Sequence, residues 1–122
     1  MKEFGYDDQK GYKRFCFQFG VKNDPELIKE YKMWHENKNI WPEIPKGIKE
    51  AGILDMQIYL LGTTLFMIMD TKLDFDLEKD MKKLGKLEKQ EEWKIFMAKF
   101  QDTDPLGEKS WELMERVFKL EN

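Results

Sequence analysis

Apolar and polar side chains alternate along residues 12–19, where every second residue from 15 to 19 is phenylalanine. An alternation with period two is typical of a β-strand with one buried face. Two more apolar, β-rich runs, 53–61 and 64–70, are separated only by Gly62 and Thr63. This spacing predicts a β-hairpin. A last run of this kind, 111–120, predicts a fourth strand.

Between these runs, apolar residues recur every three or four positions, which is the period of an amphipathic helix. One such segment begins at Asp24-Pro25 and reaches His35. It opens with a capping residue and with a proline, which suits the first helical position. A short second helix is expected to contain Pro45 and to end at Gly52. Segments 74–85 and 88–101 predict one further helical region in two pieces.

The resulting order is strand, helix, two strands, helix, strand, which is the order of the ferredoxin-like split βαβ fold of the α+β class. We therefore expect a four-stranded antiparallel sheet with its helices on one face. The strands are apolar on both sides, although the helices suffice for only one. The second face predicts a cavity or a partner subunit, and we expect a homodimer of the dimeric αβ-barrel type. Residues 1–11 are expected to be a flexible lead-in to a single domain, 12–122.

Composition narrows the class of protein. The 122 residues include 41% hydrophobic and 37% charged side chains, typical of a folded chain. The net charge of -3 gives no reason to expect nucleic acid as a partner. No apolar run is long enough for a membrane span, and the polar N-terminus does not resemble a secretory signal. Cys16 is the only cysteine, which fits a reducing compartment. We expect a cytoplasmic protein without a membrane partner.

One segment can support acid–base chemistry. His35 is the only histidine in the chain, and imidazole is the side chain that titrates near neutral pH. Tyr31 lies four residues earlier, so both project from one helix face. Spacing alone favours the alternative that this face simply packs on the sheet. The same two readings apply to Trp93, which could stack on a sugar ring or belong to the core. One histidine and one cysteine cannot form a usual metal site, and no phosphate-binding glycine loop is present, so we expect no metal and no cofactor.

Several motifs of this chain, in collinear order from Tyr12 to Leu120, resemble the L-rhamnose mutarotase family. They are Glu30-Tyr31 with His35, Ile40-Trp41-Pro42-Glu43, Ala51-Gly52, Ile58-Tyr59-Leu60, Leu65-Phe66, Trp93-Lys94 with Met97, and Val117-Phe118. The resemblance implies a cofactor-free enzyme that interconverts the α and β anomers of a 6-deoxy sugar.

The resemblance also implies roles for individual residues. His35 stands at the position of the family's proton donor, and Tyr31 at that of a substrate-binding tyrosine. A second substrate-contacting tyrosine of the family is replaced here by Met56. The family's tryptophan pair becomes Glu92 and Trp93. These replacements leave the choice of sugar open, with L-rhamnose as the default.

Three alternatives remain open on the sequence. The chain could be an L-fucose mutarotase, a non-catalytic sugar-binding module on the same scaffold, or an oxygenase- or decarboxylase-like αβ-barrel acting on apolar aromatic substrates. Opening a pyranose ring removes one proton and delivers another, and the sequence does not fix a second proton partner beside His35. Tyr31, Asp55, Glu92 or a water molecule could fill that role.

Overall fold

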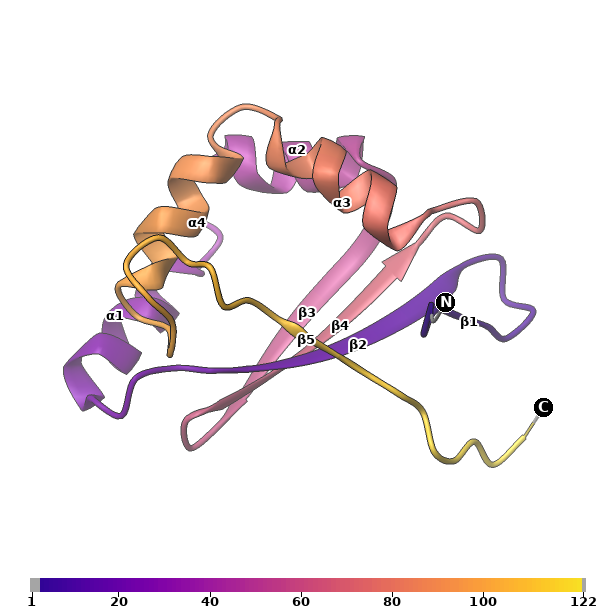
Figure 1. Cartoon of the computed structure of the whole chain (residues 1–122), viewed down its shortest axis with the longest axis horizontal. Coiled ribbons are helices and arrows are strands. Elements are labelled where there is room, and N and C mark those ends of the chain that lie inside the picture. Colours follow the sequence, from indigo (N-terminus) through magenta and orange to yellow (C-terminus); the bar gives the residue numbers. More distant parts are fainter. Residues whose placement is uncertain (1–2, 122) are drawn as a thin grey trace.

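The structure is a computed structural model that describes residues 3–121. Four helices arch over one face of an antiparallel sheet, and the other face has no helix on it (Figure 1). The elements are, in chain order, β1 (Tyr6–Asp7), β2 (Lys13–Gly20), α1 (Pro25–Trp34), α2 (Glu43–Glu50), β3 (Ile53–Leu61), β4 (Thr64–Thr71), α3 (Leu77–Gly85), α4 (Gln90–Ala98) and β5 (Glu112–Met114). No helix within residues 3–121 combines the length and apolarity that a membrane crossing requires.

The sheet topology confirms the predicted ferredoxin-like arrangement. β2 pairs with β4 on one side and with β5 on the other, and β3 pairs with the far side of β4. The order β5-β2-β4-β3 is the order in which a split βαβ fold interleaves its two halves. The β3–β4 hairpin turns at Gly62, whose φ of +61° is a conformation that glycine adopts without a steric penalty.

Helices α1 and α3 begin at aspartates that the sequence indicates as caps. The Asp24 carboxylate accepts hydrogen bonds from the backbone N–H groups of Glu26 and Leu27 at the start of α1. Asp76 accepts in the same way from Lys79 at the start of α3. These side chains satisfy backbone donors that the first helical turn leaves without partners. Local chemistry therefore determines both helix starts.

The two faces of the sheet differ sharply. The helix-covered face forms the core, and its largest fully buried side chains include Phe15, Leu65 and Met69. The open face carries the residues that alternate with them. There the Arg14 guanidinium binds the Asp70 carboxylate through two hydrogen bonds of 2.8 and 3.0 Å.

The N-terminal segment differs from the expected flexible lead-in over part of its length. Tyr6–Asp7 pairs with β2 at Arg14 and Lys13, and the Asp8 carboxylate binds the Arg116 guanidinium at 2.7 and 3.0 Å. The chain turns back because Gln9 and Gly11 adopt positive φ angles. The domain boundary before residue 12 stays a prediction.

The prediction of a strand over 111–120 is wrong beyond Met114, where β5 ends. The reason is competition for one strand edge. Met114 pairs with Cys16 of β2, so a longer β5 would next pair with the start of β2. That stretch of edge is already occupied by β1, which pairs with Arg14 and Lys13. The chain therefore leaves the sheet, and Val117 and Phe118 are exposed.

Candidate functional site

His35 lies at the C-terminal end of α1, as its capping residue. Its ring Nδ1 is 2.8 Å from the carbonyl oxygen of Tyr31. A carbonyl oxygen can only accept, so Nδ1 carries a proton and donates it into this bond. The second ring nitrogen, Nε2, is then the atom that can exchange a proton with a ligand.

Burial lowers the pKa of His35, because a charged imidazolium is poorly solvated at this position. The bond to the Tyr31 carbonyl raises the pKa, but by less than burial lowers it. The neutral ring therefore predominates at neutral pH, with Nε2 as a proton acceptor. Once protonated, this ring gives up its proton more readily than an exposed histidine would.

Tyr31 is buried directly beneath this histidine, with only 4% of its surface exposed. The two ring centroids are 4.2 Å apart, and Phe100 meets the tyrosine ring edge-on on another side. Burial raises the pKa of Tyr31, and the nearby Gln101 side chain opposes that rise only in part. Tyr31 consequently keeps its phenolic proton throughout the neutral pH range.

A cavity lies between the helices and the sheet, with His35 on its wall. It has two lobes. The β3 lobe, of about 350 Å³, lies between α2 and β3 and includes Asn37 and Lys49 in its lining. The α4 lobe, of about 410 Å³, includes Tyr31 and Trp93. The residues that line both lobes are His35, Ile40, Ile48, Met56 and Ile58.

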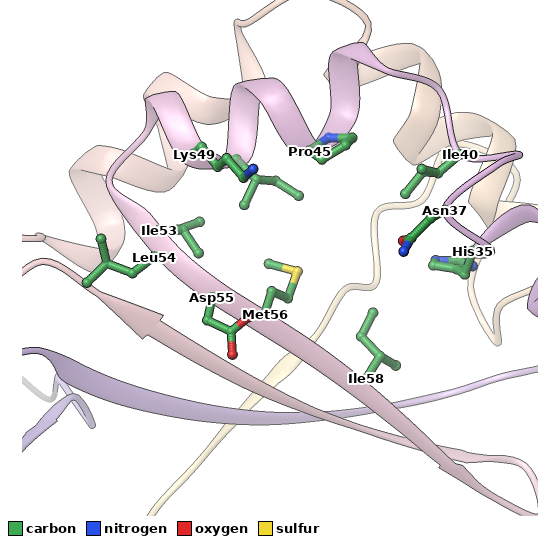
Figure 2. A pocket seen from close by; sticks show the side chains of 11 residues that line it. His35, Asn37, Ile40, Pro45, Lys49, Ile53, Leu54, Asp55, Met56 and Ile58 are labelled. Carbon is green, nitrogen blue, oxygen red and sulfur yellow. The ribbon is translucent and has the colours of Figure 1, made fainter.

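The β3 lobe is seen from close by in Figure 2. Met56 and Ile58 rise from β3 toward α2, and His35 closes one end of the lobe. Asp55 points to the opposite side of β3 from Met56, where its carboxylate accepts a hydrogen bond from the Gln57 side chain. Asp55 is among the residues that line the β3 lobe, but its carboxylate is turned toward Gln57.

Trp93 completes the aromatic wall around His35. Its ring meets the imidazole edge-on at 5.6 Å and packs at 5.0 Å against Trp41. Trp93 is half-buried and lines the α4 lobe, so part of it faces the cavity. Trp34 and Trp41 instead pack against Phe96 and line neither lobe.

The structure brings four of the predicted site residues together and leaves one apart. His35, Tyr31, Met56 and Trp93 all line the α4 lobe. Glu92 is exposed and lines neither lobe, so a direct substrate contact by Glu92 is not supported. The reason is helical phase. Successive residues of a helix are about 100° apart, so the lining residues Gln90, Trp93, Lys94 and Met97 share one face of α4, and Glu92 lies on the opposite face.

Two glutamines that the sequence reasoning missed also line the α4 lobe, Gln90 and Gln101. Both are buried, with 9% of their surface exposed. A pattern in the sequence could have identified both glutamines. With Trp93 and Met97 they recur at spacings of three and four, so two polar residues interrupt an otherwise apolar stripe. Buried polar side chains in such a stripe need hydrogen-bond partners, and often have specific roles.

Gln90 joins α2 and α4, two neighbouring helices that both line the cavity. Its Nε2 donates to the carbonyl oxygens of Glu43 and Ile44 in α2, at 3.1 and 3.2 Å. Gly47 permits this approach, since a Cβ at that position would lie 2.5 Å from the same nitrogen. The position of α4 relative to α2 therefore depends on a glycine and a glutamine.

Comparison with known proteins addresses the class of enzyme. Residues 14–120 match the model of a family described as L-rhamnose mutarotase. The chain belongs to the L-rhamnose mutarotase family. The predicted resemblance is thus confirmed, and with it the enzyme class, a carbohydrate isomerase.

Individual relatives agree with this membership. A UPF0734 protein of Dictyostelium discoideum is 39% identical over 93% of this chain and 94% of its own length. An L-fucose mutarotase of Xanthomonas campestris is 30% identical over 88% of this chain and 87% of its own. The crystal structure of an L-rhamnose mutarotase from Formosa agariphila superimposes with a TM-score of 0.68 at 24% identity, covering 88% and 98% of the two chains. The last comparison confirms the fold.

No group of three or more histidine, cysteine, aspartate or glutamate side chains within residues 3–121 is arranged to hold a metal ion. The polar groups of the cavity wall include one imidazole, one phenol and three side-chain amides, those of Asn37, Gln90 and Gln101, together with charged side chains such as Lys49 and Glu91. These groups can exchange protons with a polyol and form hydrogen bonds to it. They suit a neutral sugar.

Proposed function

We propose that the protein interconverts the α and β anomers of L-rhamnose, with His35 as proton donor and Tyr31 and Trp93 as substrate-binding residues. The observation that supports this most is the state of the imidazole. Its Nδ1–H is held by the Tyr31 carbonyl, so Nε2 remains to exchange protons at the junction of the two lobes.

Ring opening removes a proton from the anomeric hydroxyl, breaks the bond between C1 and the ring oxygen, and places a proton on that oxygen. Neutral His35 can accept the first proton at Nε2, and its imidazolium can then donate to the ring oxygen. Rotation about the C1–C2 bond and the reverse steps give the other anomer. General acid–base catalysis of this kind is typically worth about 10²- to 10⁴-fold in rate.

Exchange NMR between the two anomers of L-rhamnose tests this function. We expect the wild type to accelerate exchange and His35→Asn to abolish the acceleration. Asparagine is chosen because its amide can still donate to the Tyr31 carbonyl and cap the helix. A folded His35→Asn variant with wild-type exchange rates would refute the role of His35. A wild type that binds the sugar without accelerating exchange would identify a non-catalytic binding module.

L-Fucose is the second candidate substrate. The relative from Xanthomonas campestris is named an L-fucose mutarotase, and Met56, which lines both lobes, has no hydroxyl with which to contact a sugar. Exchange rates for both sugars at equal enzyme concentration distinguish the two. If the pocket at residue 56 sets the choice, Met56→Tyr shifts the ratio of the two rates, whereas Leu54→Tyr at the rim of the β3 lobe shifts it less.

We further propose that the protein is a homodimer, formed through the open face of the sheet. That face has no helix on it (Figure 1), and it exposes apolar side chains such as Tyr59 and Leu61, at 55% and 84%. The chain after β5 adds Val117 and Phe118, at 93% and 73%. Exposed apolar patches of this kind are typical of protein interfaces. Two copies related by a twofold axis would cover both patches at once.

Sedimentation analysis tests the dimer. We expect a dimer for the wild type and for Lys82→Glu, a control on the distant helix α3. Leu61→Lys combined with Phe118→Asp should produce a monomer. A monomeric wild type at micromolar concentration would refute the proposal.

We also propose a cytoplasmic location, supported by the single unpaired cysteine, Cys16. A fluorescent fusion found outside the cytoplasm would contradict this location.

A further inference from the structure

Four polar residues form a turn after the end of α1, beside the β3 lobe. The N–H groups of Asn39 and Ile40 donate to the Glu36 carbonyl oxygen at 2.8 and 3.0 Å, which closes the turn. The Asn39 side chain donates to the Met33 carbonyl oxygen at 2.9 Å. The Lys38 ammonium group pairs with the Glu36 carboxylate at 3.7 Å. Three of the four polar side chains therefore have a partner within the turn or at the end of α1.

Asn37 is the fourth residue of the turn, and its amide points into the β3 lobe. Figure 2 shows this side chain directed into the lobe at the end that His35 closes, and both residues belong to the lining. Within residues 3–121, no group forms a hydrogen bond with the Asn37 side chain. Because the closed turn fixes the backbone of Asn37, the amide is held beside the imidazole with its donors and its acceptor available to a ligand.

The rest of the β3 lobe is mostly apolar. Its aliphatic side chains include Ile48, Ile53 and Ile58. Two other polar residues belong to the lining, but neither lies at the same end as the imidazole. Asp55 turns its carboxylate toward Gln57, and Lys49 lies on α2, toward the opposite end of the lobe from His35 (Figure 2). Asn37 is therefore the polar side chain that shares the His35 end of this lobe.

The chemistry of the sugar determines which of its groups matches this amide. In the proposed reaction, His35 exchanges protons with the anomeric hydroxyl and with the ring oxygen. The anomeric carbon, C1, is bonded to C2, which carries a hydroxyl. The ring oxygen is bonded to C5, which carries the methyl group of a 6-deoxy sugar. A methyl group suits the apolar lining, whereas a hydroxyl removed from water needs a hydrogen-bond partner. The Asn37 amide therefore matches the 2-hydroxyl.

We propose that Asn37 is a substrate-binding residue that forms a hydrogen bond with the 2-hydroxyl of the sugar, next to the carbon at which His35 acts. This inference rests on the proposed function for its ligand. L-Rhamnose and L-fucose have opposite configurations at C2, so a group fixed beside C2 distinguishes the two candidate substrates. Asn37 thereby contributes to the choice of sugar.

Titration calorimetry with two sugars tests the proposal. Asn37→Ala removes the amide, and 2-deoxy-L-rhamnose lacks the hydroxyl. We expect Asn37→Ala to raise the dissociation constant of L-rhamnose about 3- to 10-fold, the usual value of one neutral hydrogen bond, and that of 2-deoxy-L-rhamnose less than about twofold. Lys38→Ala is the matched control, because Lys38 belongs to the same turn but lines neither lobe. It should leave both dissociation constants unchanged.

A merely structural role of Asn37 predicts a different result, namely equal losses of affinity for the two sugars and a lower midpoint of urea unfolding. We expect an unchanged midpoint, because the Asn37 side chain is exposed and has no positive φ that alanine would strain. Equal losses for both sugars, or no loss for either, would overturn the proposal. Failure of the proposed function is distinguishable from this. A wild type that does not accelerate anomer exchange, but whose Asn37→Ala variant loses affinity only for L-rhamnose, would refute catalysis and support the role of Asn37.

Discussion

Replacing Gly47 with alanine should disturb the joint between the two helices that enclose the cavity. A Cβ at residue 47 would lie 2.5 Å from Gln90 Nε2 and 3.3 Å from its Cδ. Contacts of that length are repulsive, so Gln90 has to move. It would then lose its bonds of 3.1 and 3.2 Å to the carbonyl oxygens of Glu43 and Ile44.

Two opposing contributions determine the size of the effect. Alanine stabilises a helix interior by up to about 1 kcal/mol relative to glycine. Each of the two neutral hydrogen bonds contributes about 0.5–1.5 kcal/mol. Their loss should therefore leave Gly47→Ala between neutral and about 2 kcal/mol destabilised. Gly85 is the matched control, since it lies in α3 with no atom within 4 Å of an added Cβ. Gly85→Ala should stabilise the protein by up to about 1 kcal/mol.

Urea unfolding of the two variants measures the difference directly, with circular dichroism as the signal. The same measurement in a Gln90→Ala background isolates the cause, because there Gly47→Ala should become as favourable as Gly85→Ala. If Gly47→Ala stabilises the protein that contains Gln90 as much as the control does, α2 and α4 are not joined in the way described.

Three further predictions concern the site and its supporting helix. Burial lowers the pKa of His35, so the unfolded chain binds a proton more tightly than the folded protein does. The contribution of His35 to stability should be intact above the unfolded pKa of about 6.5 and should fall as the pH drops below that value. Urea unfolding from about pH 7.5 to 5.5 should show this decrease in the wild type and not in His35→Gln. Glu91 lines the α4 lobe and Glu92 does not. In steady-state kinetics, Glu91→Gln should therefore change the KM for the sugar, whereas Glu92→Gln should leave it unchanged. Equal effects of the two substitutions would contradict the placement of Glu91, and not Glu92, at the cavity. Asp24→Ala should destabilise the protein by about 1 kcal/mol through loss of the α1 cap, as measured by urea unfolding.

The parts of the fold that could be predicted depend on local chemistry. The phenylalanine alternation of β2, the cap at Asp24 and the glycine at residue 62 act within a few residues of themselves. The end of β5 depends on a contact distant in sequence, because β1 occupies the edge that a longer β5 would need. Nothing in the apolar pattern of residues 111–120 indicates that competition.

The candidate site shows the same division. His35 and Tyr31 could be predicted because four residues on a helix determine their relative position. Glu92 was inferred from a family position, and the phase of α4 turns it to solvent. Gln101 joins the wall of the α4 lobe from beyond the end of α4, at the point where its backbone bridges to Val21. Periodicity marks it as unusual, but only the packed structure places it on the cavity wall.

The position of His35 at a helix end links stability to proton exchange. The last turn of a helix has carbonyl groups without intrahelical partners, and the His35 Nδ1–H satisfies that of Tyr31. The negative end of the helix dipole favours a charged imidazole, whereas burial opposes it. Burial has the larger effect on the pKa, so the ring rests neutral with Nε2 able to accept. The bond that caps α1 therefore also fixes the tautomer that the proposed reaction needs. A substitution at residue 35 that keeps only the cap, such as asparagine, should separate these two roles.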